Sequence, residues 1–240
     1  QGVPGTPGAP GPAGPPGPAA PQAIFLTANT PPATFAALDL AASVTSVTIN
    51  PAAATTNPGT VVNFRITDRI TGAAIVGYGS RTLASGATVG SYPNLAFSLA
   101  KLIPAAGGSP SRWVNYIVTS VSSTGVETLN RPSTDNQGTL VDNGDGTYKY
   151  TFRRDVTGMA AKVTTLPLPT GANLADLDNL TYDANATHRL TIALSGNAPG
   201  TGTNTPNAVQ VVTGVPLAKP LNVIHDFVPA TGQAPAASAN

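Results

Sequence analysis

The stretch that decides the fold class is Leu140–Phe152, which reads LVDNGDGTYKYTF. Its Asn-Gly and Asp-Gly pairs are the residues that supply the positive φ angles of tight β-hairpin turns. After the turn, Tyr148, Tyr150 and Phe152 alternate with polar residues, and this period of two is typical of a strand with one buried face. The stretch therefore predicts a hairpin turn that runs into a half-buried antiparallel strand.

The turn itself has a second interpretation. Asp142–Gly146 places oxygen-bearing side chains at the close spacing that calcium sites use. The loop lacks the terminal bidentate Glu of an EF-hand, and strands rather than helices are expected on either side of it. We therefore interpret it as a hairpin turn and keep a calcium site as the alternative.

Further strand patterns lie on both sides of the hairpin. Val44–Ile49 and Val61–Asp68 are rich in β-branched residues, and Ala186–Gly196 alternates cleanly. Trp113–Val121 has apolar residues on both faces, which predicts one long central strand. The side chains that we expect in the core are Val62, Phe64, Ile66, Ile117, Tyr150, Phe152, Leu190, Ile192 and Leu194.

Composition supports the same fold class. The 240 residues include 25 Gly and 24 Pro, which disfavour helices and favour short strands joined by turns. We predict an all-β fold, either a Greek-key β-sandwich or a split β-barrel. Only 10% of the residues are charged, the net charge is +1, and Lys and Arg are scattered, so a nucleic-acid partner is not expected. No apolar run reaches the length of a transmembrane segment.

The chain divides into three parts by composition. Residues 1–22 include triplets with Gly at every third position and much Pro, a collagen-like pattern that predicts an extended spacer or, alternatively, a trimerising stalk. Residues 23–229 form the predicted β domain, and residues 230–240 have the composition of a linker. Gln1 is not followed by a signal-peptide pattern, so any export signal is expected to have been removed or left out.

The chain contains no cysteine. A disulfide, a thiolate metal site and a cysteine nucleophile are therefore excluded. A c-type haem is attached through C-x-x-C-H, so this chain cannot hold one covalently.

The side chains that could carry chemistry form no convincing constellation. His188 and His225 are the only histidines, and we expect each to pack at a strand end with its ring nitrogens hydrogen-bonded. Arg153–Asp155 predicts a solvated strand end with weak ion pairs. Trp113 and the six tyrosines could line a sugar-binding face, but core packing of Trp113 is favoured. No G-x-S-x-G motif is present, and we expect no catalytic, cofactor-binding or metal-binding residue.

Five segments, taken in order, carry a family resemblance. They are Phe97–Pro104, Ser111–Ile117, Leu140–Phe152, Tyr182–Leu190 and His225–Pro229. In this order they resemble the region before the first haem in decahaem c-type cytochromes of the OmcA/MtrC type. The resemblance runs from about Val61 to Pro229, and it implies that this region is a β-barrel-like, Greek-key domain without haem.

The resemblance implies a function by position. We expect a haem-free accessory domain of an extracellular multihaem cytochrome, located at the cell surface and associated with the outer membrane. Its expected partners are haem-bearing domains or a partner cytochrome, with a possible upstream lipid anchor and no enzymatic activity of its own. The c-type haems are expected on a downstream or partner segment. The alternative is a structural or adhesive surface module on a collagen-like stalk.

Overall fold

The computed structural model describes residues 1–5, 21–53 and 59–236. Most of the collagen-like triplets predicted within residues 1–22 lie outside this part of the chain. The described strands are β1 (Ile24–Phe25), β2 (Leu40–Ile49), β3 (Thr60–Asp68), β4 (Ile75–Val76), β5 (Leu95–Ile103), β6 (Arg112–Asn115), β7 (Thr119–Val121), β8 (Glu127–Leu129), β9 (Thr139–Asp142), β10 (Thr147–Thr151), β11 (His188–Leu194) and β12 (Leu221–Phe227). The described helical segments are α1 (Pro32–Ala36), α2 (Met159–Val163) and the 3-10 turn η1 (Leu174–Leu177). The predicted all-β class is confirmed.

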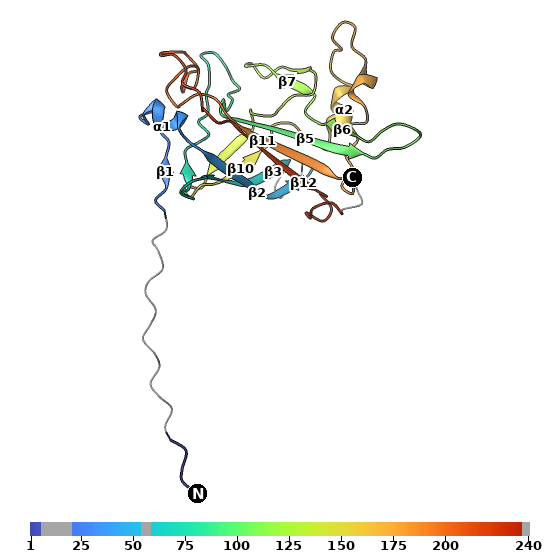
Figure 1. Cartoon of the computed structure of the whole chain (residues 1–240). Coiled ribbons are helices and arrows are strands. Elements are labelled where there is room, and N and C mark those ends of the chain that lie inside the picture. Colours follow the sequence, from blue (N-terminus) through green and yellow to red (C-terminus); the bar gives the residue numbers. More distant parts are fainter. Residues whose placement is uncertain (6–20, 54–58, 237–240) are drawn as a thin grey trace.

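Two four-stranded antiparallel sheets form the body of the molecule (Figure 1). One has the order β2-β3-β10-β9 and the other the order β12-β11-β5-β6. Two smaller sheets have two strands each: β1 pairs with β4 in parallel, and β7 pairs with β8 as an antiparallel hairpin.

The strand order is that of an immunoglobulin-like Greek key. When the eight strands of the two sheets are lettered A, B, C, C′, D, E, F and G in chain order, they form the sheets A-B-E-D and G-F-C-C′. This arrangement matches the ABED sheet of immunoglobulin domains, faced by a CFG sheet with one added strand. Of the two predicted architectures, the structure has the Greek-key β-sandwich and not the split β-barrel.

A layer of aromatic rings fills the space between the sheets. The ring of Phe97 on β5 stacks on that of Tyr150 on β10, with centroids 3.9 Å apart and planes 7° from parallel. Phe64 on β3 lies against Phe97 edge-on at 5.7 Å and against Tyr148 at 5.3 Å. All nine side chains that the sequence predicted for the core are buried. Alternation along the strands was therefore a reliable guide to the core.

The β9–β10 hairpin has the predicted turn. Gly144 and Gly146 adopt φ angles of 80° and 83°, which favour glycine because a Cβ atom would be strained there. The register pairs Tyr148 with Asp142 and Tyr150 with Leu140. This register places both tyrosine rings in the space between the two sheets.

The predicted long strand at 113–121 is wrong. The chain leaves the sheet after Asn115, and Thr119–Val121 pairs instead with β8. Asn115 explains the break, because its side-chain oxygen accepts from the Ile117 N–H at 2.8 Å and its amide donates to the Ser133 carbonyl at 3.0 Å. These bonds stabilise a bend between the two short strands. As a consequence β6 lies at the edge of its sheet and not at the centre.

A second, smaller hydrophobic cluster lies outside the sandwich. It joins α2, through Met159 and Val163, to Val114, Val118 and Leu129. This packing fixes the helix beside the β7–β8 hairpin and forms a cleft between them.

Candidate functional site in the cleft beside helix α2

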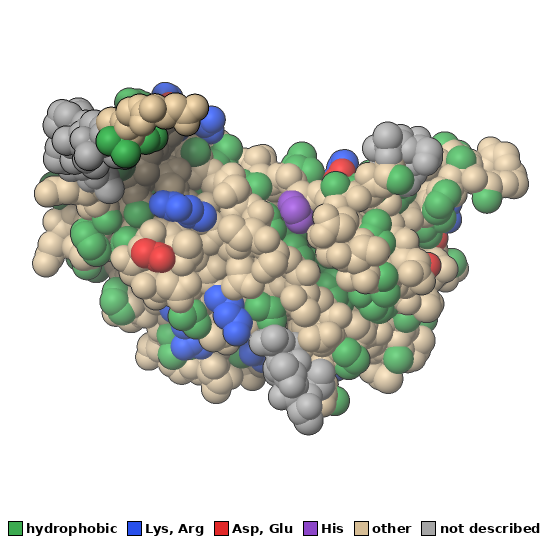
Figure 2. Space-filling view, turned by 90° about the horizontal axis from the view of Figure 1, so that it is seen from below, with side chains coloured by type: hydrophobic (Ala, Val, Ile, Leu, Met, Phe, Trp, Pro, Cys, Tyr) green, Lys and Arg blue, Asp and Glu red, His purple; other side chains and the backbone are tan. Residues whose placement is uncertain are grey.

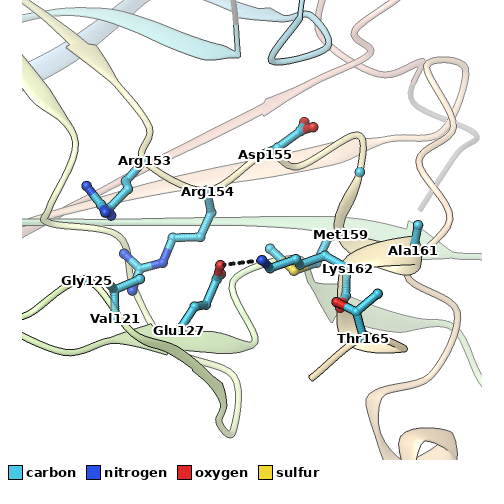
Figure 3. Close-up of a pocket in the computed structure, with 11 residues that line it drawn as sticks. Val121, Gly125, Glu127, Arg153, Arg154, Asp155, Met159, Ala161, Lys162 and Thr165 are labelled. Atoms are coloured by element: carbon cyan, nitrogen blue, oxygen red, sulfur yellow. Dashed lines mark hydrogen bonds and ion pairs between the residues drawn. The ribbon is translucent and has the colours of Figure 1, made fainter. Parts of the chain in front are cut away.

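The cleft between the β7–β8 hairpin and α2 has a volume of about 590 Å³ and is shown in Figure 3. Val121 and Glu127 line it from the hairpin, Arg153 and Arg154 from the chain after β10, and Met159 and Lys162 from the helix. From the sequence, we expect Arg153–Asp155, the segment after β10, to be a solvated strand end. Part of that segment instead forms the base of this cleft.

The position of Arg154 contradicts that prediction. Its side chain is 4% exposed and forms an ion pair at 3.1 Å with Asp135, whose side chain is fully buried. Asp135 also accepts from the backbone N–H groups of Arg153 and Arg154 and from the Tyr150 hydroxyl. A buried ion pair is tolerated only where further hydrogen bonds satisfy both groups, and the Asp135 carboxylate meets that requirement.

One N–H group of Arg154 makes no hydrogen bond within the described part of the chain. Its Nε is buried and has no hydrogen-bond partner among the described residues, while its Nη2 donates to the Thr119 carbonyl at 3.3 Å. The Arg154 side chain lies beside Glu127 in the cleft (Figure 3). Arg154 therefore keeps one buried donor without a partner among the described residues.

A polar bridge closes one side of the cleft. Lys162 Nζ lies 3.2 Å from Glu127 Oε2, and the Thr119 hydroxyl donates to Glu127 Oε1 at 2.6 Å. The Asp155 carboxylate turns away and accepts from the N–H and hydroxyl of Thr157. Both carboxylates are thus hydrogen-bonded, and the described residues lining the cleft include no His, Ser or Cys.

The two acidic residues of the β9–β10 turn bond within the protein. Asp142 accepts from the N–H groups of Gly77 and Gly144, at 2.6 and 2.9 Å. Asp145 accepts from the N–H and hydroxyl of Thr147, which lowers the pKa of its carboxyl group. The structure thus forms the hairpin turn that the sequence favoured over a calcium loop.

His188 packs as expected, at the start of β11. It is fully buried, with Nδ1 2.9 Å from the Ala186 carbonyl and Nε2 3.2 Å from the Tyr116 hydroxyl. These partners suit a neutral ring that donates from Nδ1 and accepts at Nε2. Burial lowers the pKa of His188 below its ordinary value. His225 is half-buried and stacks on Phe227, with ring centroids 5.6 Å apart.

Trp113 is not a core residue, contrary to the prediction. It lies partly exposed on edge strand β6, and the Arg189 guanidinium sits 4.3 Å from the centre of its ring. Arg189 is held there by two 2.7 Å bonds to Asp226. The edge position of β6 is the reason that the ring remains accessible. Five of the six tyrosines do not join it on a common face, because Tyr78, Tyr92, Tyr116, Tyr148 and Tyr150 are all buried.

The sequence patterns did not predict that two charged residues lie in the interior. Asp135 lies in a loop and Lys101 lies near the end of β5, and both are nearly inaccessible. Asp135 occurs in no motif, and Lys101 lies within the segment Phe97–Pro104 with no role assigned to it there. The one available signal was Lys101 itself, since it interrupts the apolar positions Leu95, Phe97 and Leu99 on the inward face of the strand.

Charge is sparse on the surface as well. Figure 2 shows a face on which Lys, Arg, Asp and Glu are few and separated. In the described residues, no three His, Asp or Glu side chains converge on a possible metal position. None of the described helices is long and apolar enough to cross a membrane.

No protein-family model matches this chain, and no curated protein matches it. Among solved structures, it is similar to the outer-membrane decahaem cytochrome OmcA, with 24% identity and a TM-score of 0.43 over 81% of this chain. It is also similar to MtrC from Shewanella baltica OS185, with 21% identity and a TM-score of 0.43 over 82% of this chain. The match covers 23% of the length of each of those two chains.

Proposed function

We propose that this chain is a haem-free accessory domain of an extracellular multihaem c-type cytochrome. It acts by spacing and docking haem-bearing segments and performs no chemistry of its own. The observation that carries the proposal is the order of the five sequence segments that resemble the OmcA/MtrC type.

The five segments occupy connected positions in the fold. Phe97–Pro104 forms most of β5, and Ser111–Ile117 contains β6, its neighbour in the sheet. Leu140–Phe152 contains the β9–β10 hairpin, while the last two segments contribute to β11 and β12. The segments therefore supply the strands on both sides of the aromatic layer.

Because the chain has no cysteine, the proposed domain carries no electrons through a covalent c-type haem of its own. Without C-x-x-C-H the chain holds no covalent c-type haem, so the haems belong to a downstream or partner segment. On this proposal residues 1–22 are a spacer from an upstream lipid anchor at the outer surface, residues 23–229 are the docking domain, and residues 230–240 are a linker.

The purified 240-residue chain tests the first half of the proposal. We expect it to be colourless, with no Soret absorbance after expression under conditions that mature c-type haem, and to show no redox wave on an electrode. A haem stained on this chain after denaturing electrophoresis would overturn the proposal.

Deletion in the organism tests the second half. Removing the codons for residues 23–229 from the reading frame should leave the haem content and potentials of the remaining cytochrome unchanged. Surface assembly or partner docking should fall, as measured by protease accessibility on whole cells and by co-purification of partner cytochromes. Normal assembly, or the absence of any C-x-x-C-H in the reading frame and its neighbouring genes, would contradict it.

The immunoglobulin-like strand order favours one second candidate. Many cell-surface modules use this sandwich, so a structural or adhesive module on a collagen-like stalk fits the same fold. Fold alone does not define function, and no described residue assigns this candidate a specific polymer or protein partner. It becomes the better one if no haem motifs accompany the gene.

A further inference from the structure

Lys101 is a buried cation without a charged partner. Its side chain lies on the inward face of β5, opposite His188, and the residue is 4% exposed. A buried ammonium group normally pairs with a carboxylate. In the described chain, Lys101 forms no ion pair and donates only to neutral oxygens, those of the Asn179 side chain and the Thr181 carbonyl. An ammonium group has three N–H donors, and the third has no oxygen acceptor among the described residues, only the ring of Tyr116 with its centroid 6.0 Å from Nζ.

The carboxylates nearest to Lys101 are already occupied. Asp178 is held by two guanidinium nitrogens of Arg112, and Asp183 accepts from the Asn185 N–H at 2.9 Å. Their fields favour the charged lysine, but burial outweighs them and lowers the pKa of Lys101. His188 beside it contributes no negative charge. The ammonium group therefore lacks a counter-ion within contact distance.

Lys101 lines a cleft of about 750 Å³ near the end of β5. One wall is the apolar segment 102–105, at the end of β5 and in the loop that follows. The other wall carries the amides of Asn179 and Asn185 together with Asp183. The cleft thus combines one buried positive charge with an apolar wall and neutral hydrogen-bonding groups.

We propose that this cleft binds a small organic monocarboxylate. The carboxylate pairs with the Lys101 ammonium group, and the apolar body of the ligand lies against residues 102–105. Asp183 on the opposite wall disfavours a second negative charge, so a single carboxylate is preferred to a dianion such as phosphate. This site is separate from the cleft beside α2 and does not depend on the cytochrome proposal.

Isothermal titration calorimetry on the whole 240-residue chain tests this proposal, with hexanoate as the probe. We expect saturable binding of hexanoate and none of hexan-1-ol, which has the same apolar body without the charge. Lys101→Met should weaken hexanoate binding about ten-fold or more, because it removes a charge-assisted hydrogen bond. Lys219→Met is the matched control, since this exposed lysine lines neither cleft, and it should bind as the wild type does.

A second variant protects the test against a folding defect in Lys101→Met. Ala105 is exposed on the wall of the cleft, and Ala105→Trp should block hexanoate while the circular dichroism spectrum stays unchanged. The proposal is wrong if hexanoate does not bind the wild type, or if hexan-1-ol or phosphate binds as tightly. Equal hexanoate binding by the wild type, Lys101→Met and Ala105→Trp would also overturn it.

Discussion

Asp135 shows how a single buried carboxylate can organise several parts of this chain. It lies in the loop before β9, and its backbone pairs with that of Phe97 on β5. Its side chain accepts from the Tyr150 hydroxyl on β10 and from Arg154 beyond that strand. The loop is therefore tied to both sheets through one residue.

Replacing Asp135 should be far more costly than replacing an exposed partner of another arginine. Asp135→Ala leaves the Arg154 charge buried and unpaired, so we expect a loss of about 3–5 kcal/mol in the free energy of unfolding. Asp226→Ala is the matched control, because its pair with Arg189 is partly exposed, with side chains 35% and 25% accessible. That variant should lose about 1 kcal/mol or less. Urea denaturation measures both, and equal losses would contradict the assigned role of Asp135.

His188 should make stability depend on pH. Burial lowers its folded-state pKa below the ordinary value of 6.5, so the unfolded chain takes up the proton first as the pH falls. Below about pH 6.5 the unfolded state binds more protons, and the free energy of unfolding therefore decreases until the pH reaches the folded-state pKa. His188→Gln should flatten this slope between pH 7.5 and 5 in denaturant titrations. An unchanged slope would show that His188 is not responsible, and His225→Gln then tests the half-buried second histidine.

At the scale of elements, the β9–β10 hairpin fixes the register of the first sheet. Two glycines with positive φ form its turn, but their surroundings differ. A Cβ atom on Gly146 would come within 2.8 Å of the Ala74 Cβ and 3.0 Å of the Ile66 carbonyl oxygen, whereas one on Gly144 would meet nothing within 4 Å. The two positions separate backbone strain from steric contact.

We therefore expect Gly146→Ala to lower the melting temperature more than Gly144→Ala. Both variants pay about 1–2 kcal/mol for a left-handed backbone, and only Gly146→Ala adds a clash. Thermal unfolding followed by circular dichroism measures the difference, and equal shifts would remove the steric argument.

The turn assignment itself is checked separately. Millimolar calcium followed by chelator should leave the melting temperature of the wild type unchanged, since Asp142 and Asp145 bond within the protein. A reversible rise of several degrees would identify a calcium site.

At the scale of the whole molecule, the sandwich has no disulfide between its sheets and depends on the packed aromatic layer. Phe152 closes one end of this layer, with its ring 5.9 Å from that of Phe97 and 5.5 Å from that of Tyr150. Phe152→Ala should cost about 3–5 kcal/mol, as large core truncations do. Phe25→Ala, which removes a ring that is 63% exposed, is the control and should change little. A denaturant midpoint that stays constant in Phe152→Ala would show that the layer tolerates the cavity.

The sequence by itself determined the fold class, nine of the core side chains and the β9–β10 turn. These features depend on local signals: alternation along Val61–Asp68, Leu140–Phe152 and Ala186–Gly196 defines buried faces, and Asn-Gly with Asp-Gly defines the turn. Each signal lies within a few residues, so it can be identified without knowing the contacts with distant parts of the chain.

Only the tertiary structure decided where the charges and the strand breaks lie. The break after Asn115 depends on a bond to the distant Ser133, and Arg154 is buried because Asp135 reaches it from another loop. Lys101 faces the interior because β11 and the segment after η1 cover it. Such contacts join residues far apart in the chain and leave no periodic trace in the sequence, since they depend on how the sheets and loops pack against each other.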